Sequence, residues 1–164
     1  MRSSLPATLE HIRVCEGGWS DDPKDPGGCT QHGITLRTWQ DQGHPGATCA
    51  SLRLITWADA AEIYTTIYWA GVRGDELPAG VDLLICDHGV NAGTGRALRL
   101  LQGVGYKPLA QADSQPIGVD FLARIAEARR DYYRSRPGFR YFGRGWLRRV
   151  DAAERAALLL IGVA

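Results

Sequence analysis

Apolar residues recur at helical spacing along the first segment of the chain, at Leu5, Leu9 and Ile12. This spacing predicts a helix over residues 4–15, with Ser4 as its cap. Gly17 and Gly18 then end the helix, because glycine readily adopts the left-handed conformation that follows a last turn. Glu16 continues the apolar progression, so its carboxylate is expected at the last turn, on the face that looks inward.

The rest of the chain is also patterned mainly as helices. Thr56 and Asp59 have the spacing of a capping box, which predicts the start of a helix that ends before Gly71. Further helices are predicted over residues 80–91, from a Thr94 cap to residue 104, over 119–135 and over 146–160, with Gly145 separating the last two. Only the stretch around residues 16–35 lacks this pattern, and "HGITL" there indicates a short strand. The sequence therefore predicts a mainly α fold with a small β-hairpin.

Size and charge exclude several classes of protein. A chain of 164 residues, 45% hydrophobic and 23% charged, is typical of one globular domain. The net charge of +1 does not indicate a nucleic-acid partner. The segment "RRDYYRSRPGFRYFGRGWLRR" is locally basic, and two interpretations stay open. The favoured one is an arginine-rich helix surface around buried aromatic residues, and the other is contact with an anionic polymer.

The sequence contains neither a membrane-spanning segment nor a metal motif. No run of 18 apolar residues is present, and "MRSSLPATLEHIRVC" lacks the apolar core of a Sec signal, so synthesis in the cytoplasm without membrane insertion is expected. The four cysteines form no CxxC pair, which argues against zinc and any other metal site. Reduced, mostly buried thiols are the favoured state of Cys15, Cys29, Cys49 and Cys86, and disulfide pairing is the alternative if the protein reaches an oxidising compartment.

An acidic, glycine-rich loop follows the first helix. "EGGW", then "DPKDPGG", then "T" and "GIT" resemble the signature of glycoside hydrolase family 108, bacterial and phage N-acetylmuramidases with a lysozyme-like fold. The segments "AAEIYTTIYW", "DHGVNAGTGRALRLLQ" and "FGRGWLRRV" resemble the rest of that family, including its predicted peptidoglycan-binding region. The resemblance implies one lysozyme-like domain over residues 1–164, with a catalytic lobe at 1–78 and a helical lobe at 79–164.

The chemistry of the loop fits glycosidic-bond cleavage, which needs a carboxylic acid to protonate the leaving oxygen. Glu16, at a helix end against an apolar face, is expected to have a pKa raised by desolvation and to act as general acid. The order Glu16, Asp25, Thr30 is similar to the catalytic trio of phage-type lysozymes. The resemblance implies that Asp25 is the second carboxylate and that Thr30 positions a water, with Asp22 as the alternative to Asp25.

Further residues are candidates for substrate binding. Trp19 offers a flat ring for stacking on a sugar, and Asp22 lies in the same loop. Asp87 and Asn91 lie at helical spacing with His88, so they are expected to line the cleft and bind N-acetyl groups. Helix capping is the alternative for Asn91, and a satisfied buried histidine is the favoured interpretation of His88.

The remaining aromatic residues are predicted to be chiefly core, with one or two as a sugar platform: Trp39, Tyr68, Trp69, Tyr141 and Trp146. The combined prediction is a monomeric N-acetylmuramidase that works without metal or cofactor. It would cleave the β-1,4 bond between N-acetylmuramic acid and N-acetylglucosamine in peptidoglycan strands. The alternatives are a lytic transglycosylase and a non-catalytic peptidoglycan-binding module.

The expected place of action is the periplasm or cell wall. A muramidase made without a Sec signal must be released to its substrate by a holin or by secretion machinery. The biological context is therefore either phage-type lysis or wall remodelling for secretion.

Overall fold

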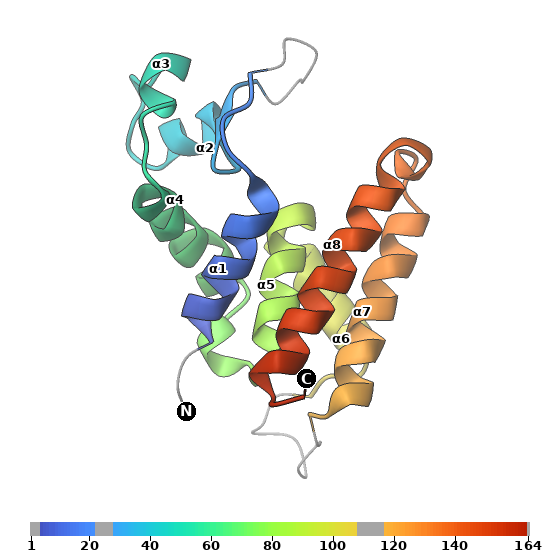
Figure 1. The fold of residues 1–164 in the computed structure, drawn as a ribbon. Helices are drawn as coiled ribbons and strands as arrows, with labels where there is room; N and C mark the ends of the chain where they lie inside the picture. Colours follow the sequence, from blue (N-terminus) through green and yellow to red (C-terminus); the bar gives the residue numbers. More distant parts are fainter. Residues whose placement is uncertain (1–3, 22–27, 108–116, 164) are drawn as a thin grey trace.

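The structure is a computed structural model that describes residues 4–21, 28–107 and 117–163 (Figure 1). It is mainly α-helical with one two-stranded antiparallel hairpin, as the sequence predicts. The elements, in chain order, are α1 (Leu5–Glu16), β1 (Thr30–Gln31), β2 (Ile34–Thr35), α2 (Leu36–Asp41), α3 (Cys49–Leu52), α4 (Trp57–Ile63), the π-helical η1 (Tyr64–Trp69), the 3-10 helix η2 (Gly74–Glu76), α5 (Val81–Ala92), α6 (Thr94–Gly103), α7 (Val119–Arg134) and α8 (Phe139–Leu160).

Helix α5 is the central element of the molecule. Every residue from Val81 to Gly89 is buried, because α5 packs against α1, α6, α7 and α8 on different sides (Figure 1). A helix that is covered all round needs apolar residues on every face, and "VDLLIC" supplies them. The polar residues Asp82, Asp87 and His88 are buried with them and need partners inside the protein.

The hairpin and the small helices α2 and α3 lie at one end of this helical body, beyond the C-terminal end of α1 (Figure 1). Thr30 pairs with Thr35, and Gln31 with Ile34. The turn between them is tight, since His32 has φ 51° and Gly33 has φ 76°. Ser20 also exchanges two backbone hydrogen bonds with Thr30, which ties the chain after α1 to the hairpin.

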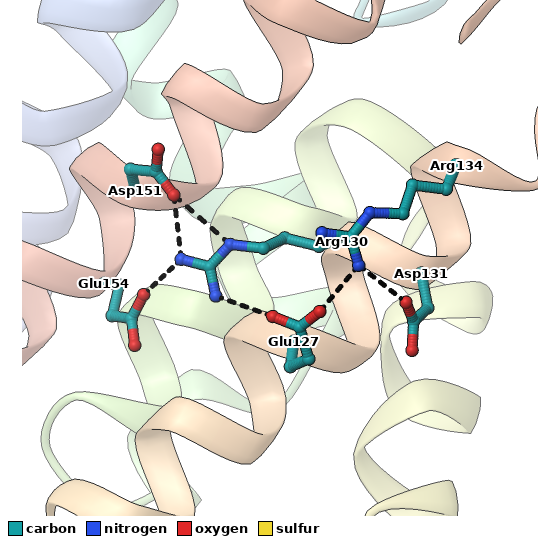
Figure 2. A network of polar contacts seen from close by, with 6 residues as sticks. All are labelled: Glu127, Arg130, Asp131, Arg134, Asp151 and Glu154. Atoms are coloured by element: carbon teal, nitrogen blue, oxygen red, sulfur yellow. Dashed lines mark hydrogen bonds and ion pairs between the residues drawn. The ribbon is translucent and has the colours of Figure 1, made fainter.

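Helices α7 and α8 form an antiparallel pair held by a surface network of charges (Figure 2). Arg130 of α7 reaches Asp151 at 2.8 Å and Glu154 at 2.5 Å on α8. On α7 itself, Arg134 lies 2.6 Å from Glu127. The pairs are partly exposed, so each contributes about 0–1 kcal/mol, and the network mainly fixes how the two helices are aligned.

Two of the predicted helix boundaries are wrong. Helix α8 is expected to begin at residue 146, after Gly145, but it runs without a break from Phe139 to Leu160. Ring contacts stabilise its first turns. The ring of Phe139 lies against Gly143, where an added Cβ atom would sit 2.6 Å from the ring. Thr94 is the first residue of α6 rather than its cap, and Gly93 at φ 89° makes the turn from α5 instead. The capping box of Thr56 and Asp59 is confirmed. Within the described ranges, no helix is long and apolar enough to cross a membrane.

The favoured prediction of reduced thiols is wrong for Cys29 and Cys49. Cys29 and Cys49 form a disulfide with their Cα atoms 5.9 Å apart, whereas Cys15 and Cys86 are free. The bond joins the residue before β1 to the first residue of α3. The fold brings these two positions together, which a spacing of 20 residues does not reveal.

Breaking this disulfide is expected to destabilise the hairpin end of the molecule. The double variant Cys29→Ala/Cys49→Ala should lose about 3 kcal/mol of unfolding free energy, because the open loop of 20 residues regains entropy in the unfolded chain. Urea denaturation of both proteins measures the difference. Equal stability of the double variant and the wild type would contradict this assignment.

Candidate active site

Glu16 is the last residue of α1 and lies where the helical body meets the hairpin. The helix ends there because Gly17, at φ 71°, leaves the helical conformation. The side chain of Glu16 is 18% exposed, so solvent reaches a carboxylate that is otherwise enclosed by protein. A partly exposed acid at a helix end can contact a large substrate without being free to move.

Arg149 of α8 holds this carboxylate in place. Its Nη1 lies 2.6 Å from Oε1 of Glu16. The predicted apolar surroundings of Glu16 are therefore wrong, because a guanidinium stands against the carboxylate instead. Oε2 of Glu16 faces the hairpin, where the Cα of Gly33 is so close that an added Cβ would lie 2.6 Å from it. One oxygen is fixed by Arg149 and the other is turned toward the hairpin.

Asp87 lies directly behind Arg149 and is fully buried. Its Oδ1 is 2.8 Å from Nη2 of Arg149, and its Oδ2 is 2.5 Å from Nη2 of Arg129. Nε2 of His11 lies 3.4 Å from Oδ1. The predicted position of Asp87 in a cleft is therefore wrong: three cationic side chains surround the carboxylate and leave it no exposed surface. Asp87 anchors the arginine that orients Glu16.

The pKa values in this network follow from the surrounding charges. Burial alone would raise the pKa of Asp87, but the charges of Arg129 and Arg149 hold it well below the ordinary value of 3.8. Burial alone would lower the pKa of His11, yet its hydrogen bonds to Asp87 and Cys15 and the charge of Asp87 raise it to about 9. Asp87 is thus a buried anion, and His11 carries a positive charge at neutral pH.

The raised pKa of His11 predicts a loss of stability at alkaline pH. The charged His11 contributes fully below its unfolded pKa of 6.5, and this contribution is lost as the pH rises through about 9. We expect the unfolding free energy to fall by on the order of 2–3 kcal/mol across this window. Urea denaturation between pH 6 and 9.5 measures this change, and the unfolding free energy of His11→Gln should vary less with pH than that of the wild type. His44→Gln serves as the control, because His44 is exposed. The same pH dependence of the unfolding free energy in all three proteins would contradict the raised pKa of His11.

The hairpin turn closes the other side of the site. Tyr64 is buried, and its hydroxyl donates a hydrogen bond to the carbonyl oxygen of His32 at 2.9 Å. Burial raises the pKa values of Tyr64 and Tyr68, so both hydroxyl groups stay protonated at neutral pH. At Gly33 an added Cβ would also lie 2.4 Å from the Tyr64 oxygen. Only glycine allows the turn to approach both side chains this closely.

Replacing Gly33 with alanine is therefore expected to displace Glu16 and to lower activity. The variant combines a strained positive φ of 76° with overlaps on Glu16 and Tyr64, and should lose on the order of 3 kcal/mol of stability. Gly43→Ala is the matched control, because Gly43 has φ 99° but open space around the added Cβ. It should cost only about 1 kcal/mol. Equal losses of unfolding free energy in the two variants, measured by urea denaturation, would contradict the close approach.

The structure brings Thr30 to the same end of the molecule. Thr30 is half-buried in β1, three residues before Gly33, whose backbone approaches Glu16 closely. Asp25, the predicted second carboxylate, and Asp22, its alternative, both lie outside the described residues. In the sequence, both aspartates stand between Ser20 and Thr30, which are joined to each other by two backbone hydrogen bonds.

The remaining predicted binding residues are partly engaged within the protein. Trp19 is half-buried, and the guanidinium of Arg53 stands 5.5 Å from the centre of its ring. Asn91 is exposed, and its amide donates to the carbonyl oxygen of Asp87 one turn earlier in α5. His88 is buried as predicted but not satisfied, since neither ring nitrogen has a hydrogen-bond partner in the described part of the chain. Burial, and secondly the charge of Arg129, lowers the pKa of His88 to about 3.

Sequence reasoning missed Arg149, Arg129 and Gly33. The two arginines stand in arginine-rich stretches that indicate a polar surface. A signal does exist: Arg129 lies on the buried stripe of α7 with Ile125 and Tyr133, at helical spacing. An arginine on an apolar stripe indicates an internal ion pair, and Asp87 on the central helix was its available partner. Among the described residues, no group of three or more His, Cys, Asp or Glu side chains could hold a metal ion.

Comparison with known proteins identifies the family. The model of glycosyl hydrolase 108 matches residues 9–93, more than half of the chain. The chain belongs to glycosyl hydrolase family 108. The matched segment contains Glu16, Thr30 and Asp87, whereas Arg129 and Arg149 lie beyond it. The family is one of glycoside hydrolases, so the chain is placed in that enzyme class.

A solved structure extends the likeness to both halves of the chain. SagA from Brucella abortus is 31% identical, with a TM-score of 0.82 over 98% of this chain and 97% of that one. No curated protein sequence matches. Because the structural match includes α7 and α8, the two helices that carry Arg129 and Arg149 belong to the shared fold.

Proposed function

We propose that the protein is an N-acetylmuramidase that cleaves the β-1,4 bond between N-acetylmuramic acid and N-acetylglucosamine in peptidoglycan. The observation that supports this most is the partly exposed Glu16, fixed through one oxygen by Arg149 and turned through the other toward the hairpin. A glycoside hydrolase needs such an immobile carboxyl group beside the scissile bond. The resemblance of the "EGGW" and "DPGG" segments to muramidases supplies the substrate class.

In this proposal each candidate residue has a distinct role. Glu16 donates its proton to the glycosidic oxygen as the bond breaks. Asp25 stabilises the positive charge that develops on the sugar or activates the incoming water, and Thr30 positions that water. Trp19 stacks on a sugar ring beside the site, and Asp22 and the exposed Asn91 contact polar groups of the glycan.

Other observations agree with action at the cell wall. The disulfide between Cys29 and Cys49 is typical of proteins that reach an oxidising compartment. We infer a monomer that acts on peptidoglycan strands in the periplasm or wall. A holin or a dedicated secretion route would release it, in phage-type lysis or in wall remodelling for secretion.

The identity of the reducing ends tests this proposal. Purified peptidoglycan is digested, reduced and separated, and the terminal sugar of each product is identified by mass spectrometry. A muramidase yields N-acetylmuramic acid at the reducing end. N-acetylglucosamine at that position would indicate a different bond, 1,6-anhydro ends would indicate a lytic transglycosylase, and intact glycan bound by the protein would indicate a binding module.

A further inference from the structure

The hairpin end of the molecule is built from elements that are too short to be stable alone. Strands β1 and β2 have two residues each, α3 has four and α2 has six. A lone two-stranded hairpin is marginally stable in water, and so is an isolated helix of fewer than about 12 residues. These elements pack mainly on one another, α3 on β1 and α2 on β2 and α3. Residues 28–55, which contain them, are called the hairpin unit below.

The Cys29–Cys49 disulfide ties the two halves of the hairpin unit together. Cys29 is buried directly before β1, and Cys49 is the half-buried first residue of α3. The carbonyl oxygen of Cys29 accepts a hydrogen bond from the backbone N–H of Leu36, the first residue of α2, at 3.1 Å. Cys29 is therefore fixed to α3 through its side chain and to α2 through its backbone. Opening the disulfide removes the covalent part of this attachment.

The hairpin unit carries one side of the candidate active site. Thr30 directly follows Cys29 in the chain. Three residues later, the turn brings Gly33 so close to Glu16 that an added Cβ would lie 2.6 Å from its Oε2. Since misplacing a catalytic group by about 1 Å can cost on the order of 100-fold in rate, loosening the hairpin unit is enough to slow cleavage strongly.

The opposite side of the site does not depend on the disulfide. Glu16 on α1 is held by Arg149 of α8, which is held in turn by Asp87 of α5. These helices pack on one another in the helical body, and α5 is buried between them. None of the three residues belongs to the hairpin unit. Reduction of the disulfide is therefore expected to free the hairpin unit while the helical body and the position of Glu16 persist.

We propose that the Cys29–Cys49 disulfide is a redox switch for cleavage at Glu16. The protein is inactive while the two thiols are reduced and becomes active when they are oxidised. This inference rests on the proposed function, because it takes the reaction at Glu16 to be cleavage of peptidoglycan. The switch keeps the enzyme inert in a reducing compartment and turns it on in an oxidising one, where such bonds persist.

The activating reaction is exchange with the disulfide of an oxidised thiol–disulfide oxidoreductase. A thiolate of the protein attacks that disulfide and forms a mixed disulfide, and the second cysteine then displaces the oxidoreductase. The two cysteines lose two protons and two electrons and form one S–S bond, and the oxidoreductase takes up both electrons and both protons as a dithiol. Cys49 is more exposed than Cys29, so the mixed disulfide is expected at Cys49.

The cleavage rates of the two redox states test the proposal. Purified wild type is oxidised with glutathione disulfide or reduced with dithiothreitol, its free thiols are counted, and the release of soluble fragments from sacculi is followed. The reduced form should cleave about 100-fold more slowly, and re-oxidation should restore the rate. Far-UV circular dichroism should show the same helix content in both forms.

The double variant Cys29→Ser/Cys49→Ser is the matched control. It should cleave at the rate of the reduced wild type, and dithiothreitol should not change that rate. An equal rate for oxidised and reduced wild type would overturn the proposal. So would an equal response of the double variant to dithiothreitol, because that response cannot come from this bond. A loss of helix content on reduction would also overturn it, since the bond would then hold the whole fold rather than the site.

Hydrogen exchange separates this inference from the proposed function. It is measured by mass spectrometry on both redox states of the wild type, without substrate. Reduction should speed exchange in peptides from β1, β2 and α3 and leave exchange in α5 unchanged. This result would support the switch even if the wild type proved to cleave another bond. Unchanged exchange in the hairpin unit would overturn it even if the protein proved to be a muramidase.

Discussion

Replacing Glu16 with glutamine is expected to lower the rate of peptidoglycan cleavage by roughly 10²–10⁴-fold, the contribution typical of a general acid. Glutamine has the same shape and can still accept a hydrogen bond from Arg149, but its amide cannot donate a proton to the leaving oxygen. The loss should appear in kcat, with little change in KM. The release of soluble fragments from purified sacculi measures the rate.

Glu10→Gln is the matched control for this change. Glu10 lies on the same helix and also pairs with an arginine, Arg13, but the pair is exposed and far from the hairpin turn. The same loss of charge there should leave the rate unchanged. Retention of most of the cleavage activity in the Glu16→Gln protein would contradict the assignment of Glu16 as the acid.

Replacing Asp87 with asparagine is expected to have the largest effect on stability. The substitution leaves Arg129, Arg149 and His11 around a neutral amide in the buried centre of the helical body. Removing one partner of a buried ion pair typically costs about 3–5 kcal/mol, because the remaining charge is left uncompensated. Urea denaturation at pH 7 measures this loss, and the cleavage rate per folded molecule should also fall because Arg149 no longer has a fixed position.

Asp151→Asn supplies the comparison for Asp87. Asp151 pairs with Arg130 between α7 and α8, but its side chain is 45% exposed, so its loss should cost less than about 1 kcal/mol (Figure 2). A similar small loss for Asp87→Asn would mean that the buried network does not hold the helical body together, and that Arg149 is oriented by other contacts.

The parts of the molecule that local sequence determines were predictable. The apolar spacing of α1 and the two glycines after it place Glu16 at a helix end, and the capping box of Thr56 marks the start of α4, because these features depend on residues a few positions apart. The surroundings of Glu16 were not predictable in the same way. Arg149 lies 133 positions further along the chain, and only the packing of α8 against α1 and α5 brings it there.

The same limit explains the other errors. Asp87 and Asn91 share one side of a helix, which suggested a common cleft, but α5 is enclosed on all sides and only Asn91, at its end, is exposed. The pairing of Cys29 with Cys49 depends on how the hairpin folds onto α3. Tyr141 has a neighbourhood that indicates burial, yet its side chain is 70% exposed and the guanidinium of Arg140 on the same helix lies 4.5 Å from the centre of its ring.

The central claim is that Glu16, held by Arg149, cleaves a glycosidic bond of peptidoglycan by adding water. Digestion in water enriched in oxygen-18, followed by mass spectrometry of the products, tests it most directly. The wild type should give N-acetylmuramic acid reducing ends that carry one heavy oxygen, and the Glu16→Gln protein should give almost none. Unlabelled 1,6-anhydro ends from the wild type, or labelled ends in equal amount from Glu16→Gln, would contradict the claim.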